Sequence, residues 1–305
     1  MAQQSGVLSR VLLSYETAYG ANPSPTAANL LPVISCGLDR KQAHQVPEVI
    51  DGVRTASKPV YGLQDVSGDI VVPVELANLG KWLRAAFGQT TTPWGDGGTQ
   101  PSLVVEDQSS SPAIFKRFNG MMVNSLALDF TAPGPYQMTL GMVGKLLTVG
   151  GSTYDGSPAA AASKIPVGWN HLALSIGGSP VTNFRRFSLA VAFGLVTETH
   201  AIAGGGKETQ VLAGRMAVTG QVEALLSDTN LWTWAEGGTE KELELVATVG
   251  SDTLTITVPT AMFARAEAPL DGPGGRRIIG TWTGYDETRD GAAGRLVSFA
   301  IALAS

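Results

Sequence analysis

The sequence repeats itself at a fixed spacing, and this repeat constrains the fold more than any other feature. Residues 66–70 (Val-Ser-Gly-Asp-Ile) return 152 residues later as residues 218–222 (Val-Thr-Gly-Gln-Val) in a chain of 305 residues. At the same spacing, eight of the 33 positions from Ile50 to Trp82 are identical without a gap. We therefore predict two divergent copies of one module of roughly 150 residues.

The repeat defines a domain division. The first module covers residues 1–150, with an N-terminal arm, a loop over 37–59 and a helix near 75–87. A glycine- and alanine-rich linker is expected over 151–163. The second module covers 164–305, with hairpins over 187–222 and 242–258. Each module is large enough to bury a hydrophobic core of its own.

Composition and local patterns favour strands over helices. The chain holds 37 glycines and 17 prolines, and its apolar residues mostly alternate with polar ones. One helix is expected where Leu76, Leu79, Leu83 and Phe87 recur at helical spacing and Gly88 follows as a C-cap. The predicted fold is mainly β: two tandem β-sandwich modules, each with a short flanking α-helix. The residues expected to pack these helices onto the modules are Leu79, Trp82, Leu83, Leu231 and Trp234.

Two polar or flexible segments are candidates for contact with a partner. The stretch over 37–59 is polar and irregular, and a loop of that length inside a compact domain is usually functional. Its counterpart is a glycine-rich tip in the second module. The candidate contact residues are Asp39, Arg40, Lys41, Glu48, Arg54, Lys58, Gly204, Gly205, Gly206 and Lys207.

Motifs for catalysis or for cofactor binding are missing. The three histidines have no metal-ligand spacing, and Cys36 is the single cysteine. The run from Gly204 to Lys207 fails as a phosphate loop because Glu208 follows where Ser or Thr is needed. A formal net charge of −5 argues against a reader of nucleic acid sequence. We predict a protein that is not an enzyme and has no cofactor or metal site.

The N-terminus has neither a basic segment nor a long apolar run, so no signal peptide is expected. The longest apolar stretch, Leu189–Val196, is far shorter than a membrane span. We therefore expect a protein that is soluble and intracellular when it is made, with no membrane partner.

The order of several motifs carries a family resemblance. Tyr15-Glu16-Thr17 precedes Leu31-Pro32 and the Asp65–Ile70 segment; the helix ending in Phe87-Gly88 and the stretch Gly120–Leu126 follow. This order resembles the major tail tube proteins of long-tailed, non-contractile bacteriophages. The turn Gly272–Gly275 before a terminal strand pair fits the same family. The chain differs from the simplest members in length, since they carry one module.

The resemblance implies a structural virion protein located in the phage tail and assembled in the host cytoplasm. Modules of this family join edge to edge into rings around a lumen, and stacked rings form the conduit for genome delivery. Double-stranded DNA would pass the lumen without specific binding, and an acidic wall would keep it mobile. The other implied partners are further copies of the chain, a tape measure protein and tail-end proteins.

The duplication leaves two ring symmetries open. Three chains make a pseudo-hexameric ring if both modules face the lumen, and six chains make it if only one does. We favour three, because both modules keep the strand-then-helix pattern at equal spacing. The candidate contact residues named above are expected between stacked rings. The alternative functions are a non-enzymatic tandem β-sandwich binding module and a minor tail or tail-terminator protein.

Overall fold

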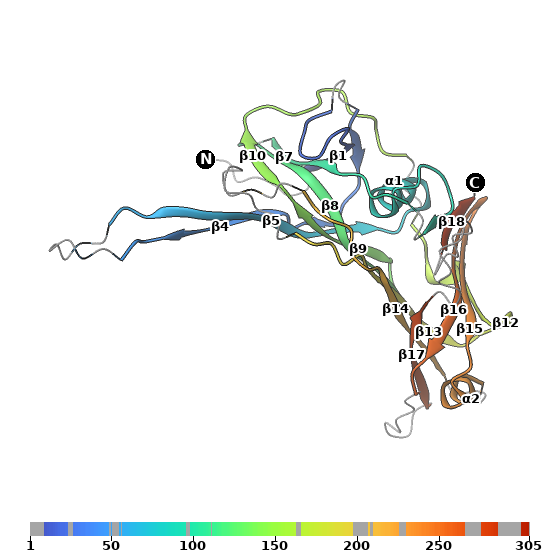
Figure 1. Cartoon of the computed structure of the whole chain (residues 1–305). Coiled ribbons are helices and arrows are strands. Elements are labelled where there is room, and N and C mark those ends of the chain that lie inside the picture. The colour runs from blue at the N-terminus through green and yellow to red at the C-terminus, as the bar shows by residue number, and fades with distance from the viewer. Residues whose placement is uncertain are drawn as a thin grey trace.

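The computed structural model describes most of the chain. The described residues are 9–23, 27–48, 50, 55, 57–95, 98–110, 112–162, 166–197, 207, 210–225, 230–265, 276–285 and 300–304. Among them are eighteen β-strands and two α-helices, so the predicted mainly-β fold class is confirmed. Figure 1 shows two packed regions joined by a long sheet, with a narrow two-stranded arm projecting from one end.

The first half supplies ten strands and the longer helix. They are β1 (Arg10–Tyr15), β2 (Asn29–Leu31), β3 (Ser35–Cys36), β4 (Asp39–Gln45), β5 (Val60–Pro73), α1 (Leu76–Phe87), β6 (Trp94–Gly95), β7 (Leu103–Ser110), β8 (Ala113–Thr131), β9 (Gln137–Gly144) and β10 (Leu146–Gly150). The second half begins with a single 3₁₀ turn, η2 (Trp169–His171). Its other elements are β11 (Leu172–Ile176), β12 (Ser179–Pro180), β13 (Phe184–Ala192), β14 (Ala217–Leu225), α2 (Asn230–Gly237), β15 (Lys241–Val249), β16 (Asp252–Phe263), β17 (Arg277–Gly284) and β18 (Ala300–Ala304).

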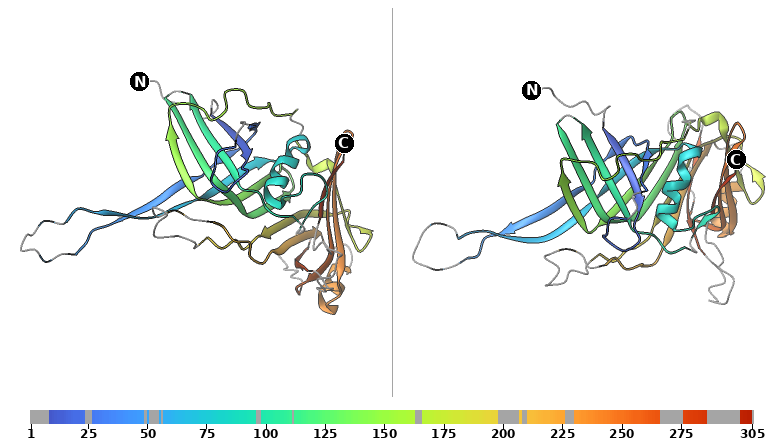
Figure 2. Two further views of the ribbon diagram at one scale, coloured as in Figure 1. Left: turned by 45° about the horizontal axis from the view of Figure 1, so that its top comes forward. Right: turned by 90° about the horizontal axis from the view of Figure 1, so that it is seen from above.

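One antiparallel sheet runs through both halves in the order β4-β5-β9-β8-β13-β14-β17. Strand β8 is long enough to belong to two layers. Its first part pairs with β7 and β10, and its second part pairs with β9 and β13. In the second half, β16 pairs with β15 and β18 and then reaches β17. Each half is thus a two-layer arrangement, and the shared sheet connects them (Figure 2).

Strand pairing repeats with the sequence. β5 and β9 pair from Val66↔Gly144 to Pro73↔Gln137, and β14 and β17 pair from Val218↔Gly284 to Leu225↔Arg277. The β5 residues lie 152 positions before their β14 counterparts, as the identities in the sequence require. The register shift between the first and third residues of β7 recurs in β15. The sequence repeat therefore coincides with a repeat of strand register, bulges included.

The predicted helix is present as α1. Leu79, Trp82 and Leu83 are at most 1% exposed in the core, and Gly88 adopts φ 84° while its N–H bonds to the carbonyl of Arg84. In α2, Leu231 is buried, whereas Trp234 is partly buried and lies under the ammonium of Lys241. The shorter helix therefore packs less deeply than its counterpart.

Two segments differ from their sequence-based description. Asp39–Gln45 is a strand paired with β5, although the whole 37–59 segment was expected to be an irregular loop. Its residues are almost all exposed on both faces, so no apolar alternation marks the strand. Arg10–Tyr15, expected within an extended arm, is a largely buried strand paired with β7.

The segment expected as a linker is held on the first half. The Tyr154 N–H bonds to the carboxylate of Glu106, and the Leu30 N–H bonds to the Ala159 carbonyl. β13 and β14 are the strands of the hairpin expected over 187–222, and β15 and β16 are those of the hairpin over 242–258. The domain boundaries at 150 and 164 remain a prediction.

The repeated glycines Gly68 and Gly220 serve the same close approach of two strands. A Cβ at Gly68 would overlap the carbonyl of Gly37, and φ there is 150°. A Cβ at Gly220 would overlap the carbonyl of Ser188 and the ring of Trp282. No heavy atom lies within 4 Å of a Cβ placed at Gly156, which is exposed.

We predict that Gly68→Ala and Gly220→Ala each destabilise the fold by about 1–3 kcal/mol, because the strands must separate to admit a methyl group. The matched control Gly156→Ala should leave stability unchanged or slightly raised. Urea denaturation followed by tryptophan fluorescence measures all three. Equal midpoints for the three variants would contradict this explanation of the repeated glycines.

Candidate functional site

One face of the long sheet carries small side chains and is open to solvent. A row across five strands reads Thr139, Ala127, Ala190, Thr219, Thr283 in register from β9 to β17. Alternate residues of the same strands, such as Leu128 and Val191, point to the opposite face and are buried. The open face therefore extends without interruption across the junction between the two halves.

Charges on this face are few and mostly acidic. Two arginines on it are held by carboxylates: Arg186 contacts Asp129 with Nε–Oδ1 at 3.2 Å, and Arg277 contacts Glu223 with Nη1–Oε1 at 3.0 Å. The register places the carboxylates of β5, Asp65 and Asp69, and Asp39 of β4 on the same face. Lys41, opposite Asp65, is the remaining cation on the described strands of this face. The charges on the described strands of this face therefore sum to a net negative value.

The first arm, defined as β4 with residues 57–65, projects beyond the rest of the molecule (Figures 1 and 2). It exposes apolar side chains along its length. Val60 is 59% exposed, Tyr61 79% and Leu63 60%. A line of exposed apolar residues on a projecting hairpin is typical of a surface that a partner covers.

The candidate contact residues are distributed between the arm and segments outside the described residues. Asp39, Arg40, Lys41, Glu48 and Lys58 are exposed on or beside the first arm. Lys207 is half-buried in the second half. Arg54, Gly204, Gly205 and Gly206 lie outside the described residues.

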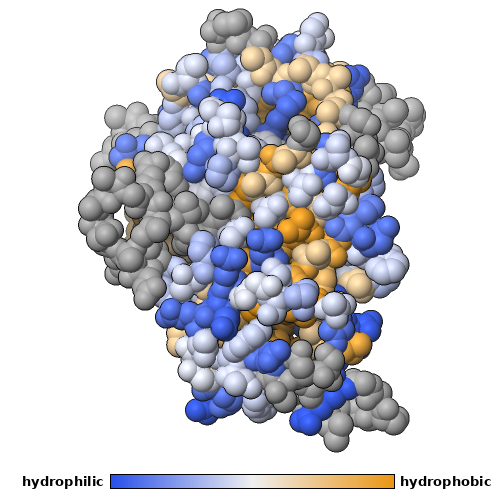
Figure 3. Space-filling model, turned by 90° about the vertical axis from the view of Figure 1, so that its right-hand side faces the viewer, coloured by the Kyte–Doolittle hydropathy of each residue, from blue (hydrophilic) through white to orange (hydrophobic). Residues whose placement is uncertain are grey.

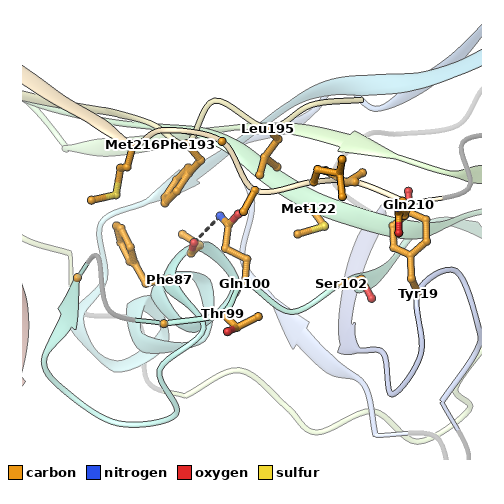
Figure 4. Close-up of a pocket in the computed structure, with 17 residues that line it drawn as sticks. Tyr19, Phe87, Thr99, Gln100, Ser102, Met122, Phe193, Leu195, Gln210 and Met216 are labelled. Carbon is orange, nitrogen blue, oxygen red and sulfur yellow. Dashed lines mark hydrogen bonds between the residues drawn. The ribbon is translucent and has the colours of Figure 1, made fainter. Parts of the chain in front are cut away.

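The second arm, defined as residues 193–197 and 210–216, lies against the first half. Phe193 packs on Phe87 with ring centroids 5.3 Å apart. The N–H groups of Phe193 and Leu195 bond to the backbone oxygen and the side-chain oxygen of Asn124, at 2.9 and 3.0 Å. Figure 4 shows the Phe193 and Phe87 rings next to each other at one end of the pocket.

The pocket beneath the second arm has a volume of about 520 Å³. Met122 and Met216 line it together with Tyr19 and Gln100. The Gln100 amide donates to the carbonyls of Ala86 and Val123, which fixes the end of α1 on β8. Thioether, aromatic and amide groups provide packing and orientation here, and they include no nucleophile paired with a base.

The carboxylates buried in the first half act as structural groups. Glu106 is fully buried and contacts the Arg117 guanidinium at 3.1 Å. Burial raises the pKa of Glu16, while hydrogen bonds from Ser102 and from the Gly120 and Gly20 N–H groups oppose the shift. Burial also raises the pKa of Tyr15 to about 12; its hydroxyl donates to the Lys81 carbonyl at 2.7 Å. These contacts tie β1 to α1 and to β8.

An apolar stripe marks the outer side of the second half. Figure 3 shows it between hydrophilic residues on the side of the molecule formed by β15, β16 and β18. Within the described residues, no three His, Cys, Asp or Glu side chains cluster in a way that could hold a metal ion. In the same part of the chain, no helix has both the length and the apolar character that crossing a membrane requires.

The open face was missed from the sequence. In the sequence, Ser125, Ala127 and Asp129 alternate with the apolar residues of one strand, and this alternation marks only that strand. The signal that could have revealed it is that these polar positions are small or acidic in strand after strand. Without the cross-strand register, the residues cannot be assembled into one surface.

Fold and surfaces together define a structural β protein with an open sheet face, a free terminal strand and an unpacked arm. A family model for the phage tail tube protein matches residues 6–285. The chain therefore belongs to the phage tail tube protein family, as the order of its motifs suggested. Its role is structural, in a tail tube that self-assembles as part of the virion. Comparison with curated proteins gives no match.

A lysine introduced on one face of β13 should have a different effect on stability from a lysine introduced on the other face. We predict that Ala190→Lys changes stability by less than about 0.5 kcal/mol, because the side chain enters solvent. Val191→Lys should prevent folding or cost several kcal/mol, because an ammonium would enter the core. Urea denaturation and circular dichroism measure both. Equal tolerance at the two positions would contradict the assignment of the open face.

Proposed function

We propose that this chain polymerises into stacked rings whose lumen is lined by the open sheet face, and that the resulting tube conducts the phage genome into the host. The observation that carries the proposal is the continuity of this face across both halves. A surface on which small residues lie in register across five strands suits the inner wall of a conduit. Closing the sheet into a ring would also remove its exposed terminal edges.

The same continuity supports three chains per ring. β8 and β13 pair over seven residues, from Ser125↔Ala192 to Thr131↔Arg186, and so place both halves in one sheet. If both halves face the lumen, three chains provide six similar sectors. A six-chain ring would place one half outside the lumen, and the shared sheet argues against that arrangement.

The charge of the face supports passage of DNA without binding. Because each arginine on it is paired with a carboxylate and Lys41 lies opposite Asp65, the uncompensated charges are mainly those of Asp39 and Asp69. Like charge repels the phosphate backbone and keeps the polyanion away from the wall. The remaining proposed partners are a tape measure protein and tail-end proteins, with assembly in the host cytoplasm. We retain the outer part of the first arm, with Glu48 and Lys58, as a ring-to-ring contact.

Electron microscopy of the purified protein over a concentration series tests the ring proposal. We expect hollow stacked rings with a mass of three chains per ring, measured by light scattering or mass photometry. Six outward knobs around a separate inner cylinder would contradict the three-chain ring. A protein that stays monomeric at every concentration, even with purified tail-end complexes as initiators, would contradict the tube function.

A positive charge introduced on the open face tests the lumen assignment. Tubes of the Ala190→Lys variant should retain double-stranded DNA that co-sediments with them, and the retention should fall steeply as salt rises. Gly156→Lys adds the same charge at an exposed position away from the face. Equal DNA retention by the two variants would show that the open face does not line the lumen.

A further inference from the structure

The two arms occupy equivalent positions in the two halves. β4 and β5 end their pairing at Gln45↔Val60 after a register shift, and the bridge Val196↔Leu212 falls at the same place beyond β13 and β14. Gly62 and Gly214, identical at the 152-residue spacing, each face a carbonyl of the opposite strand of their arm. The first and second arms are therefore versions of one element.

The second arm has a docking surface within its own chain. It continues the β8–β13 ladder past Ala192, where the Phe193 N–H bonds to the Asn124 carbonyl. It lies over the pocket lined by Met122, which is only 9% exposed. The first half of the chain thus provides the surface on which the second arm packs.

Within the described residues, no arm lies over the equivalent surface on the second half. Met262 pairs with Thr283 of β17 as Met122 pairs with Val143 of β9, so the two methionines correspond. Met262 is nevertheless 47% exposed. Beside it, Ala264 takes the place of Asn124 and bonds through its N–H to the Thr281 carbonyl. Among the described residues, the first arm therefore contacts no such surface, and this surface of the second half contacts no arm.

We infer that the first arm of one copy docks on the second half of a second copy, repeating the contact that the second arm makes within the chain. Lys41 is the counterpart of Ala192, and Arg265 is the counterpart of its partner Ser125, so the docked arm places Lys41 opposite Arg265. In the same way, Gln42 lies beside Ala264. This inference rests on the proposed ring and assigns the base of the first arm to a contact within one ring. The outer part of the arm remains available to the next ring.

The internal contact and the inferred contact differ in polarity. Thr239 lies 152 residues after Phe87, and strand register makes Gln42, which follows Lys41 as Phe193 follows Ala192, the counterpart of Phe193. The apolar pair within one chain thus corresponds to a polar pair between chains. Polar contacts suit an interface whose two surfaces must stay soluble before assembly.

Charges at the contact also balance. Arg265 has the Glu236 carboxylate at 3.9 Å, and Lys41 lies directly across the ladder from Asp65. Two cations and two carboxylates therefore meet, which offsets the repulsion between Lys41 and Arg265. The exposed apolar residues of the arm, including Tyr61, would come to lie near Met262 and lose their contact with water.

Disulfide trapping tests the inference in assembled tubes. In a Cys36→Ala background, Lys41→Cys with Arg265→Cys should form a bond between copies on oxidation, because directly opposed residues in an antiparallel ladder have disulfide geometry. The series of covalently linked oligomers should end at the number of copies in one ring, three on the proposed symmetry. The shifted pair Asp39→Cys with Arg265→Cys should cross-link far less.

The internal counterpart provides the matched control. Ser125→Cys with Ala192→Cys occupies the equivalent pair inside one chain and should close within the monomer. Mixing the single variants Lys41→Cys and Arg265→Cys should give dimers, whereas neither variant alone should. If the double variant does not form tubes, the same readout is taken from Gln42→Cys with Ala264→Cys.

The outcomes separate the inference from the proposed function. Tubes that form normally and give no covalent bond at either pair overturn the arm contact but leave the tube function standing. Covalently linked oligomers larger than one ring place the arm between rings, which also overturns the inference. Failure of the unmodified protein to form rings, even with purified tail-end complexes as initiators, contradicts the proposed function itself.

Discussion

The pairing of β8 with β13 is the constraint on which the rest of the structure depends. It joins two strands that lie about half a module apart in sequence and belong to different halves. Because the pairing is antiparallel and in register, the inward residues of both halves share one core and the outward residues share one open face. A shift of one residue would put Leu126 and Val191 on opposite faces of the sheet. The register of this single pair therefore decides whether the molecule has a continuous wall at all.

Duplication explains why that pairing is available. In each half, a terminal strand (β4 or β13) precedes the central strand of the repeat (β5 or β14), and the strand at the other end is β8 or β16. When two such units are joined in one chain, the β8 edge of the first pairs with the β13 edge of the second. The edges left at the two ends are β4, the counterpart of β13, and β16, the counterpart of β8. An oligomer built from them repeats a contact that each chain already contains, which makes its interface heterologous and closable into a ring.

Local features could be read from the sequence, and non-local ones could not. The helix α1 follows from leucine spacing and the Gly88 cap, and the hairpin of β15 and β16 follows from alternation around a tight turn. β4 could not be predicted from the sequence because both of its faces are exposed to solvent, which removes the alternation of apolar and polar residues. Five of the charged residues proposed as contacts are exposed on or beside the first arm, and their role as contacts stays a prediction. The open face depends on cross-strand register, which no local pattern encodes.

A free terminal strand is a hazard in a protein that must remain separate until it assembles. β4 meets this hazard with polar and charged residues along most of its length: Asp39, Arg40, Lys41, Gln42 and His44. These side chains disfavour pairing with arbitrary apolar edges, since burying them without partners is costly. They do not disfavour pairing with an edge that brings its own compensating charges, as the Arg265–Glu236 region does. The polarity that hid β4 from sequence analysis is therefore the property that makes its pairing selective.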